Sequence, residues 1–419
     1  MTRFMGGRVA LKHLCLMLCG VLPGLEAGSS RAAEWSAEPS VALRADYNDN
    51  INLTSAPHPG VWGIKLSPDV KFSGETETLK VTGGLNVRIN RYFGEDGLDT
   101  IDHTLSLRSD YKAERDLVGL KIDSIRDSTL VSELATTGAV QARRQRSLLT
   151  ANPTWSRALT EATSLRASYS YTDVHYDESA GTGLINYGDQ SASVGIESKL
   201  DERNVVNVTA YYDRYETNPA ESRASTYGVQ GGYDHDFSET LHGSFVVGLR
   251  RTQSTISSDA LVCDGPIILG FCLGTITEVT SVQKETSSGY TLNASLAKRW
   301  ETDTVSGQLS REINPSGVGS LIQTDRIQMI WTKEWSPTLS SNISAAAYRS
   351  RYIGGVVTNS NTRYYTVEPR LTWRLAEGWA LDAGYSYARQ NYETVPVKAT
   401  ANVVYVNLNY AWPKISVSR

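Results

Sequence analysis

The chain has 419 residues, of which 40% are hydrophobic and 21% are charged, and its formal net charge is −4. No basic block stands out, so nucleic acid is not expected as a partner. Beyond the N-terminal segment, no apolar run reaches the roughly 18 residues that a membrane-spanning helix requires. The main part of the chain is therefore either soluble or spans a membrane with strands.

The first 33 residues have the layout of a secretory signal peptide. A positively charged region contains Arg3, Arg8 and Lys12. An apolar stretch over residues 14–25 follows, and it is too short to span a bilayer. The possible cleavage positions are Ala27, Ser29 and Ala33. A lipoprotein anchored at Cys19 is the disfavoured alternative, because no small residue precedes this cysteine. We expect a signal peptide over 1–33 and a single domain over 34–419.

Alternation of apolar and polar residues dominates the rest of the chain. Leu85, Val87 and Ile89, for example, alternate with Asn86 and Arg88. Successive side chains of a strand face opposite sides, so each such segment has one apolar and one polar face. Eighteen segments of this kind are predicted near residues 40–54, 60–73, 77–92, 100–112, 116–128, 145–157, 162–176, 184–200, 203–216, 223–236, 240–256, 286–299, 302–313, 320–334, 337–352, 362–375, 378–393 and 399–412.

Short and long connections alternate between these segments. The short turns lie near residues 73–76, 113–115, 201–202, 237–239, 301–303, 336–337 and 376–378. The longer links include residues 129–144, 177–183, 257–285 and 353–361. Strands of soluble β-sandwiches and propellers average about five or six residues, whereas these segments run well beyond ten. The alternation is typical of a membrane barrel, which has short periplasmic turns and longer extracellular loops.

The aromatic residues support the same fold. Tyr is abundant (22 residues) and Phe is scarce (6 residues), although an ordinary core would favour Phe. Many Tyr and Trp residues lie near segment ends, where they predict girdles at the two membrane interfaces. Because an unpaired strand edge cannot face lipid, the first and last strands must pair. We therefore predict an all-β fold: a transmembrane, antiparallel, up-and-down β-barrel of about 18 strands in the bacterial outer membrane.

Two cysteines remain after the signal peptide. Cys263 and Cys272 lie in a short apolar segment, and in an oxidising periplasm they predict a disulfide that closes a small loop. Free thiols are the alternative, and metal binding needs more ligands than this segment has. The surrounding link, residues 257–285, could either fold inward as a constriction or lid, or remain a surface loop.

Charged residues on the polar faces should project into the lumen. The lumen-lining candidates are Lys80, Arg88, Arg108, Asp110, Arg166, Glu312, Arg326, Glu368, Arg370, Arg374 and Asp382. They could line a water-filled path and set its selectivity, as charged rings do in channels. They could equally be salt-bridged side chains that stabilise a wide barrel. Barrels of sixteen to eighteen strands leave an aqueous channel, which favours the first interpretation.

Catalysis is not expected. The histidines after the signal peptide are scattered, and no hydrolase, zinc-protease or phosphate-loop motif is present. His235 lies between Asp234 and Asp236 beside a short turn, where a solvated side chain is a simpler interpretation than a catalytic pair. We predict no enzyme activity, no cofactor and no metal site.

Two short motifs resemble a known family. Tyr47-Asn48-Asp49-Asn50-Ile51 is similar to the opening of the β-barrel porin 2 family, and Tyr410-Ala411-Trp412-Pro413-Lys414 is similar to its ending. Members are often encoded with exopolysaccharide synthesis systems, so the resemblance implies passage of polysaccharide through the outer membrane and assigns no catalytic residue. The chain ends at Arg419 and not at an aromatic residue, which departs from the usual signal for barrel assembly.

Three functional hypotheses follow. The first is a porin or channel that passes exopolysaccharide or other polar solutes. The second is a structural or adhesive surface protein in which the long loops carry the function. The third, an outer-membrane hydrolase, is the least favoured. Expected partners are outer-membrane lipid, the barrel-assembly machinery and polysaccharide export or synthesis proteins.

Overall fold

The computed structural model describes residues 34–138, 142–177, 181–218, 222–265, 267–268, 271–272, 274–353, 361–393 and 397–418. The predicted signal peptide over residues 1–33 lies outside this part of the chain. Among the described residues, no helix is long and apolar enough to cross a membrane.

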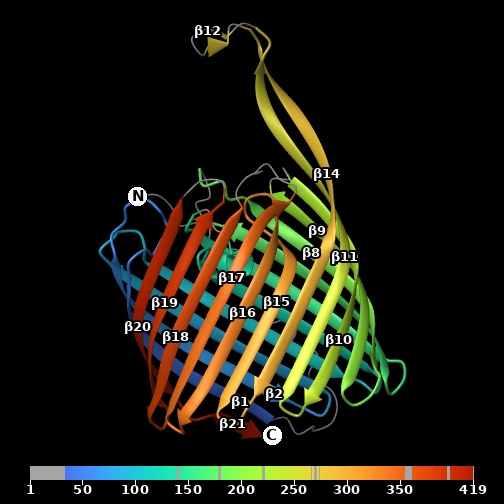
Figure 1. Cartoon of the computed structure of the whole chain (residues 1–419), viewed down its shortest axis with the longest axis vertical. Coiled ribbons are helices and arrows are strands. Elements are labelled where there is room, and N and C mark those ends of the chain that lie inside the picture. The colour runs from blue at the N-terminus through green and yellow to red at the C-terminus, as the bar shows by residue number, and fades with distance from the viewer. Residues whose placement is uncertain are drawn as a thin grey trace.

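Eighteen long antiparallel strands form one closed barrel (Figure 1). They are β1 (Glu34–Asn48), β2 (Val61–Glu75), β3 (Leu79–Phe93), β4 (Thr100–Lys112), β5 (Asp116–Ser128), β6 (Gln145–Ala158), β7 (Thr163–Tyr176), β8 (Asn186–Lys199), β9 (Asn204–Asn218), β10 (Ser222–Ser238), β11 (Leu241–Cys263), β14 (Ile276–Arg299), β15 (Asp303–Pro315), β16 (Leu321–Ser336), β17 (Leu339–Ile353), β18 (Thr362–Ala376), β19 (Trp379–Tyr392) and β20 (Lys398–Ala411). Each pairs with its neighbour along the chain, and β1 also pairs with β20 from Ser40–Ala411 to Asn48–Val403. The predicted barrel of about 18 strands is confirmed.

The predicted two-faced strands explain this closure. On β15 and β16, outward positions carry exposed Leu309, Ile327 and Met329, while the alternate positions carry polar side chains such as Gln308 and Gln328. The same division recurs around the wall, so the exterior is apolar and the interior polar. Because every strand has two partners, no edge of the ring is left to face the hydrocarbon of the membrane.

The chain continues past the last barrel strand. After Trp412-Pro413-Lys414 it forms β21 (Ile415–Ser418), which pairs with the first residues of β1 from Glu34–Ser418 to Ala37–Ile415. The sequence prediction ended at residue 412 and missed this extension. Pro413 has no backbone donor, and so it interrupts the ladder while the chain stays alongside β1.

The first strand was placed wrongly in the sequence prediction. It runs over Glu34–Asn48 instead of 40–54, because a turn begins directly after it. The Asn50 side chain accepts a hydrogen bond from Thr54 N (3.0 Å), and Leu53 adopts a φ of 46°. The side chain also donates to Thr400 O on β20 (2.8 Å), so the turn is fastened to the last strand.

Asp49 completes this fastening at the seam between β1 and β20. Its carboxylate accepts hydrogen bonds from Asn402 N (2.7 Å) and Asn402 Nδ2 (2.6 Å), and its own N–H donates to Asn402 O (3.1 Å). Two residues of the motif that resembles the β-barrel porin 2 family, Asp49 and Asn50, therefore hold the seam where the barrel closes.

Replacing Asp49 with Ala should weaken barrel closure. Hydrogen bonds to a charged group contribute about 1.5–3 kcal/mol, so the free energy of unfolding should fall by about 2 kcal/mol. Urea unfolding of the purified barrel, followed by tryptophan fluorescence and by mobility of the unheated protein in gels, measures this loss. Asp96→Ala, at an exposed position between β3 and β4, is the control. Equal midpoints for both variants would contradict the role of Asp49.

One hairpin extends far beyond the barrel (Figure 1). β11 and β14 stay paired from Leu241–Lys298 to Cys263–Ile276, and two short strands, β12 (Ile267–Ile268) and β13 (Phe271–Cys272), lie at the tip. The structure therefore favours the surface interpretation of residues 257–285 over the inward constriction. Cys263 is disulfide-bonded, while the side chain of Cys272 lies outside the described residues, so their pairing stays a prediction.

The two edges of the outer wall differ in composition. The short-turn edge carries most of the exposed tryptophans, while Trp62 lies at the long-loop edge. Those of the short-turn edge are Trp35, Trp300, Trp335, Trp373, Trp379 and Trp412. At the long-loop edge the outward positions carry tyrosines and the arginines Arg91, Arg126, Arg214, Arg223, Arg251, Arg311, Arg349, Arg351, Arg363 and Arg389. Membrane barrels turn their longer loops outward, so the arginine-bearing edge is the extracellular one.

Candidate functional site: a lumen crossed by a loop

All eleven lumen-lining candidates occupy inward positions of their strands. Several pair locally near the short-turn edge: Arg108 with Asp110 (2.7 Å), Arg166 with Glu197 (2.5 Å) and Lys80 with Glu75 (3.2 Å). The Arg374 guanidinium donates to Pro337 O (3.1 Å). These residues are spread around the wall and form no common site.

The remaining candidates lie elsewhere on the inner wall of the barrel. Glu368 accepts a hydrogen bond from the Tyr405 hydroxyl (2.9 Å), and the nearby Arg370 takes an inward position on the same strand, β18. Asp382 accepts bonds from Thr372 (2.7 Å), Asn407 (3.1 Å) and Asn409 (2.7 Å). Arg326 donates to Gln308 (3.4 Å), while Arg88 and Glu312 line two separate cavities described below. Whether any of them sets selectivity stays a prediction.

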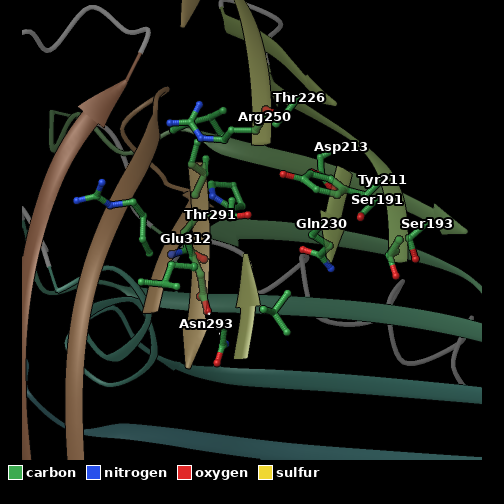
Figure 2. A pocket seen from close by; sticks show the side chains of 18 of the residues that line it. Ser191, Ser193, Tyr211, Asp213, Thr226, Gln230, Arg250, Thr291, Asn293 and Glu312 are labelled. Atoms are coloured by element: carbon green, nitrogen blue, oxygen red, sulfur yellow. Dashed lines mark hydrogen bonds between the residues drawn. The ribbon is translucent and has the colours of Figure 1, made fainter. Parts of the chain in front are cut away.

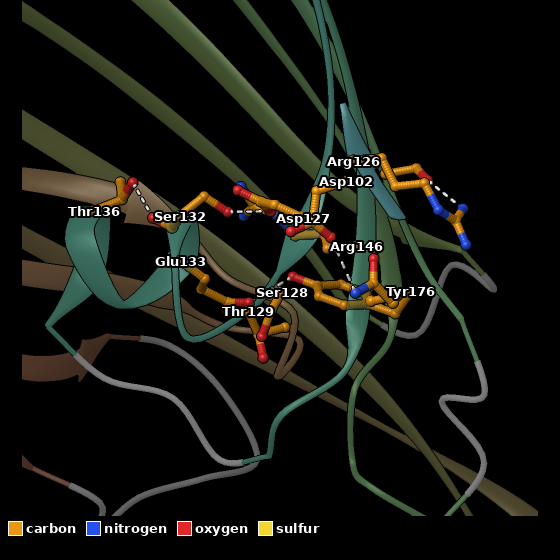
Figure 3. Close-up of polar contacts among 12 residues, drawn as sticks. Asp102, Arg126, Asp127, Ser128, Thr129, Ser132, Glu133, Thr136, Arg146 and Tyr176 are labelled. Atoms are coloured by element: carbon orange, nitrogen blue, oxygen red, sulfur yellow. Dashed lines mark hydrogen bonds and ion pairs between the residues drawn. The ribbon is translucent and has the colours of Figure 1, made fainter. Parts of the chain in front are cut away.

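A loop between β5 and β6 folds into the lumen and carries a short helix, α2 (Ser132–Thr137). Ser132 donates to Asp127 Oδ1 at the end of β5 (2.7 Å), and Gly138 closes the helix with its N–H bonded to Leu134 O (2.8 Å). Figure 3 shows Ser132, Glu133 and Thr136 on the helix beside Asp127 and Arg146 of the adjacent strands. We call residues 129–138 the plug.

The plug reaches the wall opposite its own strands. The carbonyl of Thr137 accepts hydrogen bonds from Thr324 on β16 (3.2 Å) and from Ser350 on β17. The carbonyl of Gly138 accepts one from Thr362 on β18 (3.4 Å). Since β16 stands halfway round the ring from β5, the plug crosses the full width of the lumen.

Gly138 is required where the plug touches this far wall. Its φ is 68°, and a Cβ at this position would lie 2.5 Å from Cβ of Tyr348 on β17. Any other residue would therefore have to push the plug away from β17. The position shows how closely the plug and the wall fit.

A second inward loop, residues 316–320 between β15 and β16, meets the plug. The Glu133 carboxylate accepts hydrogen bonds from Gly317 N (3.4 Å) and from the Tyr176 hydroxyl of β7 (3.1 Å). Tyr215 of β9 donates to Ser316 O (2.8 Å), which holds this loop from the other side. One carboxylate thus joins both loops to the barrel wall.

Glu133 is almost completely buried, and this burial raises the pKa of its carboxyl group. The positive charge of Arg146 and the hydrogen bonds from Gly317 and Tyr176 act in the opposite direction. The carboxylate is therefore harder to ionise while the plug is docked than it would be in water.

Two apolar clusters flank the plug. One contains Leu134 of α2 with Leu53, Tyr348, Tyr364, Ala399 and Ala401. The other contains Val174, Tyr176, Leu184, Tyr187, Tyr215, Ala224 and Leu321. The first cluster buries Leu134 of the plug, which adds hydrophobic stabilisation to the docked plug. The second packs against Val318 of the other inward loop.

One cavity of the lumen lies between β8 and β15 and has a volume of about 680 Å³. We call it the larger cavity, because the second cavity described below is smaller. Figure 2 shows its side chains pointing inward from these strands, among them Asp213, Tyr211, Arg250 and Glu312. The lining also includes Asp189 and several Ser, Thr, Asn and Gln side chains. Its lining combines carboxylates and the arginines Arg250 and Arg311 with many uncharged hydrogen-bonding groups.

A second cavity, of about 510 Å³, lies on the other side between β1 and β5 and reaches β18–β20. Its charged lining consists of Arg44, Lys65, Arg88 and Arg143 with a single carboxylate, Asp102. Arg44 stacks on Tyr405 (3.8 Å) and Lys65 pairs with Asp46 (2.8 Å), whereas Arg88 has no ion-pair partner among the described residues. This basic cavity is suited to anionic groups.

Sequence reasoning missed the plug and the two cavities. The one signal in this link was the run of helix-forming residues Glu133, Leu134 and Ala135 followed by Gly138, which can end a helix. Within the described part of the chain, no group of three or more His, Cys, Asp or Glu side chains is placed to hold a metal ion.

No family model matches the chain, and no curated protein matches its sequence. Among solved structures, Acinetobacter baumannii OccAB3 is 12% identical, with 90% of this chain and 99% of that chain covered and a TM-score of 0.44. A. baumannii OccAB2 is 11% identical, with coverages of 90% and 98% and a TM-score of 0.46. Pseudomonas aeruginosa OccK2 (OpdF), solved in complex with glucuronate, is 10% identical, with coverages of 90% and 98% and a TM-score of 0.45. Similarities of this degree support no assignment of function or family.

The position of the protein follows from the wall itself. Large hydrophobic side chains stay exposed on outward positions around the ring, and most of the exposed tryptophans lie at the short-turn edge. Such an apolar exterior is unfavourable in water and suits the hydrocarbon of a membrane. Closed barrels with short turns on one side are the strand-based architecture of outer membranes. The chain is an outer-membrane β-barrel of eighteen strands.

Proposed function

We propose that this barrel is an outer-membrane channel for polar, anionic solutes, gated by the plug. The observation that carries the proposal is the polar lumen with a cavity on either side of a loop that crosses it. A barrel this wide would be water-filled without the loop. The few hydrogen bonds between the plug tip and β16–β18 can be broken without opening the wall.

The lining indicates the chemistry of the solute. The basic cavity attracts carboxylate or phosphate groups, and the larger cavity offers Tyr211 with many hydroxyl and amide groups for hydrogen bonds to sugars. An acidic exopolysaccharide or its fragments would use both kinds of lining. The resemblance of two short motifs to the β-barrel porin 2 family supports the same solute class, and loss of exported polymer in a deletion strain would test it.

Single-channel recording in planar bilayers tests the channel itself. The purified barrel should show discrete conductance steps with closures caused by the plug. A barrel that stays silent at all voltages, with the plug intact and with residues 131–142 replaced by a short Gly-Ser link, would contradict the proposal.

Arg88→Gln should lower the preference for anions. One charge about 6 Å from a passing ion contributes about 0.7 kcal/mol in a water-like dielectric, so the permeability ratio should fall roughly threefold. Reversal potentials in a salt gradient measure this ratio. Arg126→Gln removes the same charge from an outward position of β5, and its ratio should stay unchanged. A shift of similar size in both variants would assign the effect to net charge instead of the lumen.

A second candidate function is adhesion, because the β11–β14 hairpin projects far beyond the barrel. Ser257 and Val282 are directly paired, so residues 258–281 can be replaced by Asn-Gly without disturbing the wall. Adhesion predicts that this variant loses attachment to surfaces while its conductance is unchanged.

A further inference from the structure

The extracellular edge of the outer wall contains a cavity of about 510 Å³ across β14–β18. Its lower part is apolar and is formed by the outward side chains of Leu309, Ile327 and Ala347. Its upper part is charged and contains Arg311, Arg349 and Arg363 together with the carboxylate of Asp325. The apolar part continues the lipid-facing surface, so the cavity lies at the boundary between hydrocarbon and headgroups.

The charges above this boundary do not balance. Asp325 is shared by two guanidinium groups, Arg311 (2.5 and 2.9 Å) and Arg351 (2.7 Å). Glu393 is likewise shared by Arg363 (2.7 Å) and Arg349 (3.4 Å). Each carboxylate thus leaves one positive charge without a counterion, and the Arg349 and Arg363 side chains remain about half exposed. Guanidinium groups bind phosphate through paired hydrogen bonds, and so this surface fits a phosphorylated group.

The wall is incomplete at the same place. The β14–β15 ladder ends at the pair Leu292–Arg311, although β15 continues to Pro315 along β16. Above this point, β14 pairs only with β11. Tyr290 of β14 lies over the Arg311 guanidinium (4.3 Å) and forms one side of the cavity, and Tyr365 of β18 lines it as well. Polar backbone left unpaired at the membrane surface needs a partner, which a headgroup can supply.

We propose that this cavity binds one phosphorylated glycolipid of the outer leaflet, with its acyl chains along Leu309, Ile327 and Ala347 and its phosphate on Arg349 and Arg363. The site lies on the outside of the barrel and does not depend on passage through the lumen. A lipid held there would cover the short ladder between β14 and β15.

Native mass spectrometry of the delipidated barrel tests this site, with bis-phosphorylated lipid A as the probe. The wild-type protein should retain one lipid. The double variant Arg349→Gln, Arg363→Gln should bind at least tenfold more weakly, and lipid A without phosphates should bind the wild-type protein as weakly. Arg349→Lys, Arg363→Lys keeps the charge but loses the paired geometry, so its binding should be intermediate.

A matched control exists elsewhere on the same edge. Arg214 and Arg223 share Glu216 (3.1 and 2.9 Å) on β9 and β10, and neither residue lines the cavity. The variant Arg214→Gln, Arg223→Gln should keep wild-type affinity. The proposal would be overturned if both glutamine double variants bound lipid A equally weakly. It would also be overturned if the folded Arg349→Gln, Arg363→Gln barrel bound lipid A as tightly as the wild-type protein. Competition by equimolar inorganic phosphate would also overturn it, because the site would then bind a free anion.

Discussion

Gly138→Ala should convert the barrel to a channel with several-fold higher conductance. The added Cβ would lie 2.5 Å from Tyr348 Cβ, a distance that real Cβ contacts do not show. Tyr348 Cβ is fixed to the backbone of β17, which is paired on both sides with β16 and β18, so the plug tip is the part that can move. Its hydrogen bonds to Thr324, Ser350 and Thr362 depend on that close approach, so they should be lost together.

Gly97→Ala is the matched control for this variant. Gly97 has a similar φ, 77° against 68°, but its Cβ would meet nothing within 4 Å. Both alanines therefore carry the strain of a positive φ, about 1–2 kcal/mol, while only one collides with the wall. Planar-bilayer recording should show wild-type conductance for Gly97→Ala. If Gly138→Ala also conducts like the wild-type protein, contact with β17 does not hold the plug in place.

The barrel wall could be predicted from sequence because lipid enforces a simple rule. Each membrane-spanning strand must show one apolar face, and so the alternation at Leu85, Val87 and Ile89 identifies a strand from the sequence alone. Outside the membrane the rule does not apply. Both faces of the β11–β14 extension are free of lipid, which explains why residues 257–263 lacked the pattern and were predicted as a loop.

The plug could not be predicted for a different reason. Its helix has six residues, too few for a helical period to stand out, and it is stabilised by contacts with residues far along the chain. Glu133, for instance, bonds to Gly317, and Thr137 to Thr324 and Ser350. Sequence reasoning could place the inward residues on the wall but could not show which loop would meet them.

Conductance should fall as the pH is lowered, because protonation of Glu133 favours the docked plug. Burial raises the pKa of Glu133 in the docked state, and release of the plug into water returns that pKa to its ordinary value. The docked state thus binds the proton more tightly. Docking is strongest below the ordinary pKa of Glu and weakens as the pH rises to the raised, docked value. One proton can change the docking equilibrium by at most about tenfold per pH unit.

Glu133→Gln separates this mechanism from a general effect of pH on the lumen. The amide keeps the shape of the protonated carboxyl group and cannot ionise, so the variant should stay in the low-conductance state across the whole range. The other charged groups beside Glu133 are Arg146, which stays protonated, and Asp127 of β5. Both act on Glu133 directly, so the control is taken from a lumen carboxylate away from the plug. Asp382, which is bonded to Thr372, Asn407 and Asn409, is such a group, and Asp382→Asn should retain the wild-type pH dependence. If conductance of Glu133→Gln still varies with pH as in the wild-type protein, the plug responds to another group, and Glu133 serves only to join the two inward loops.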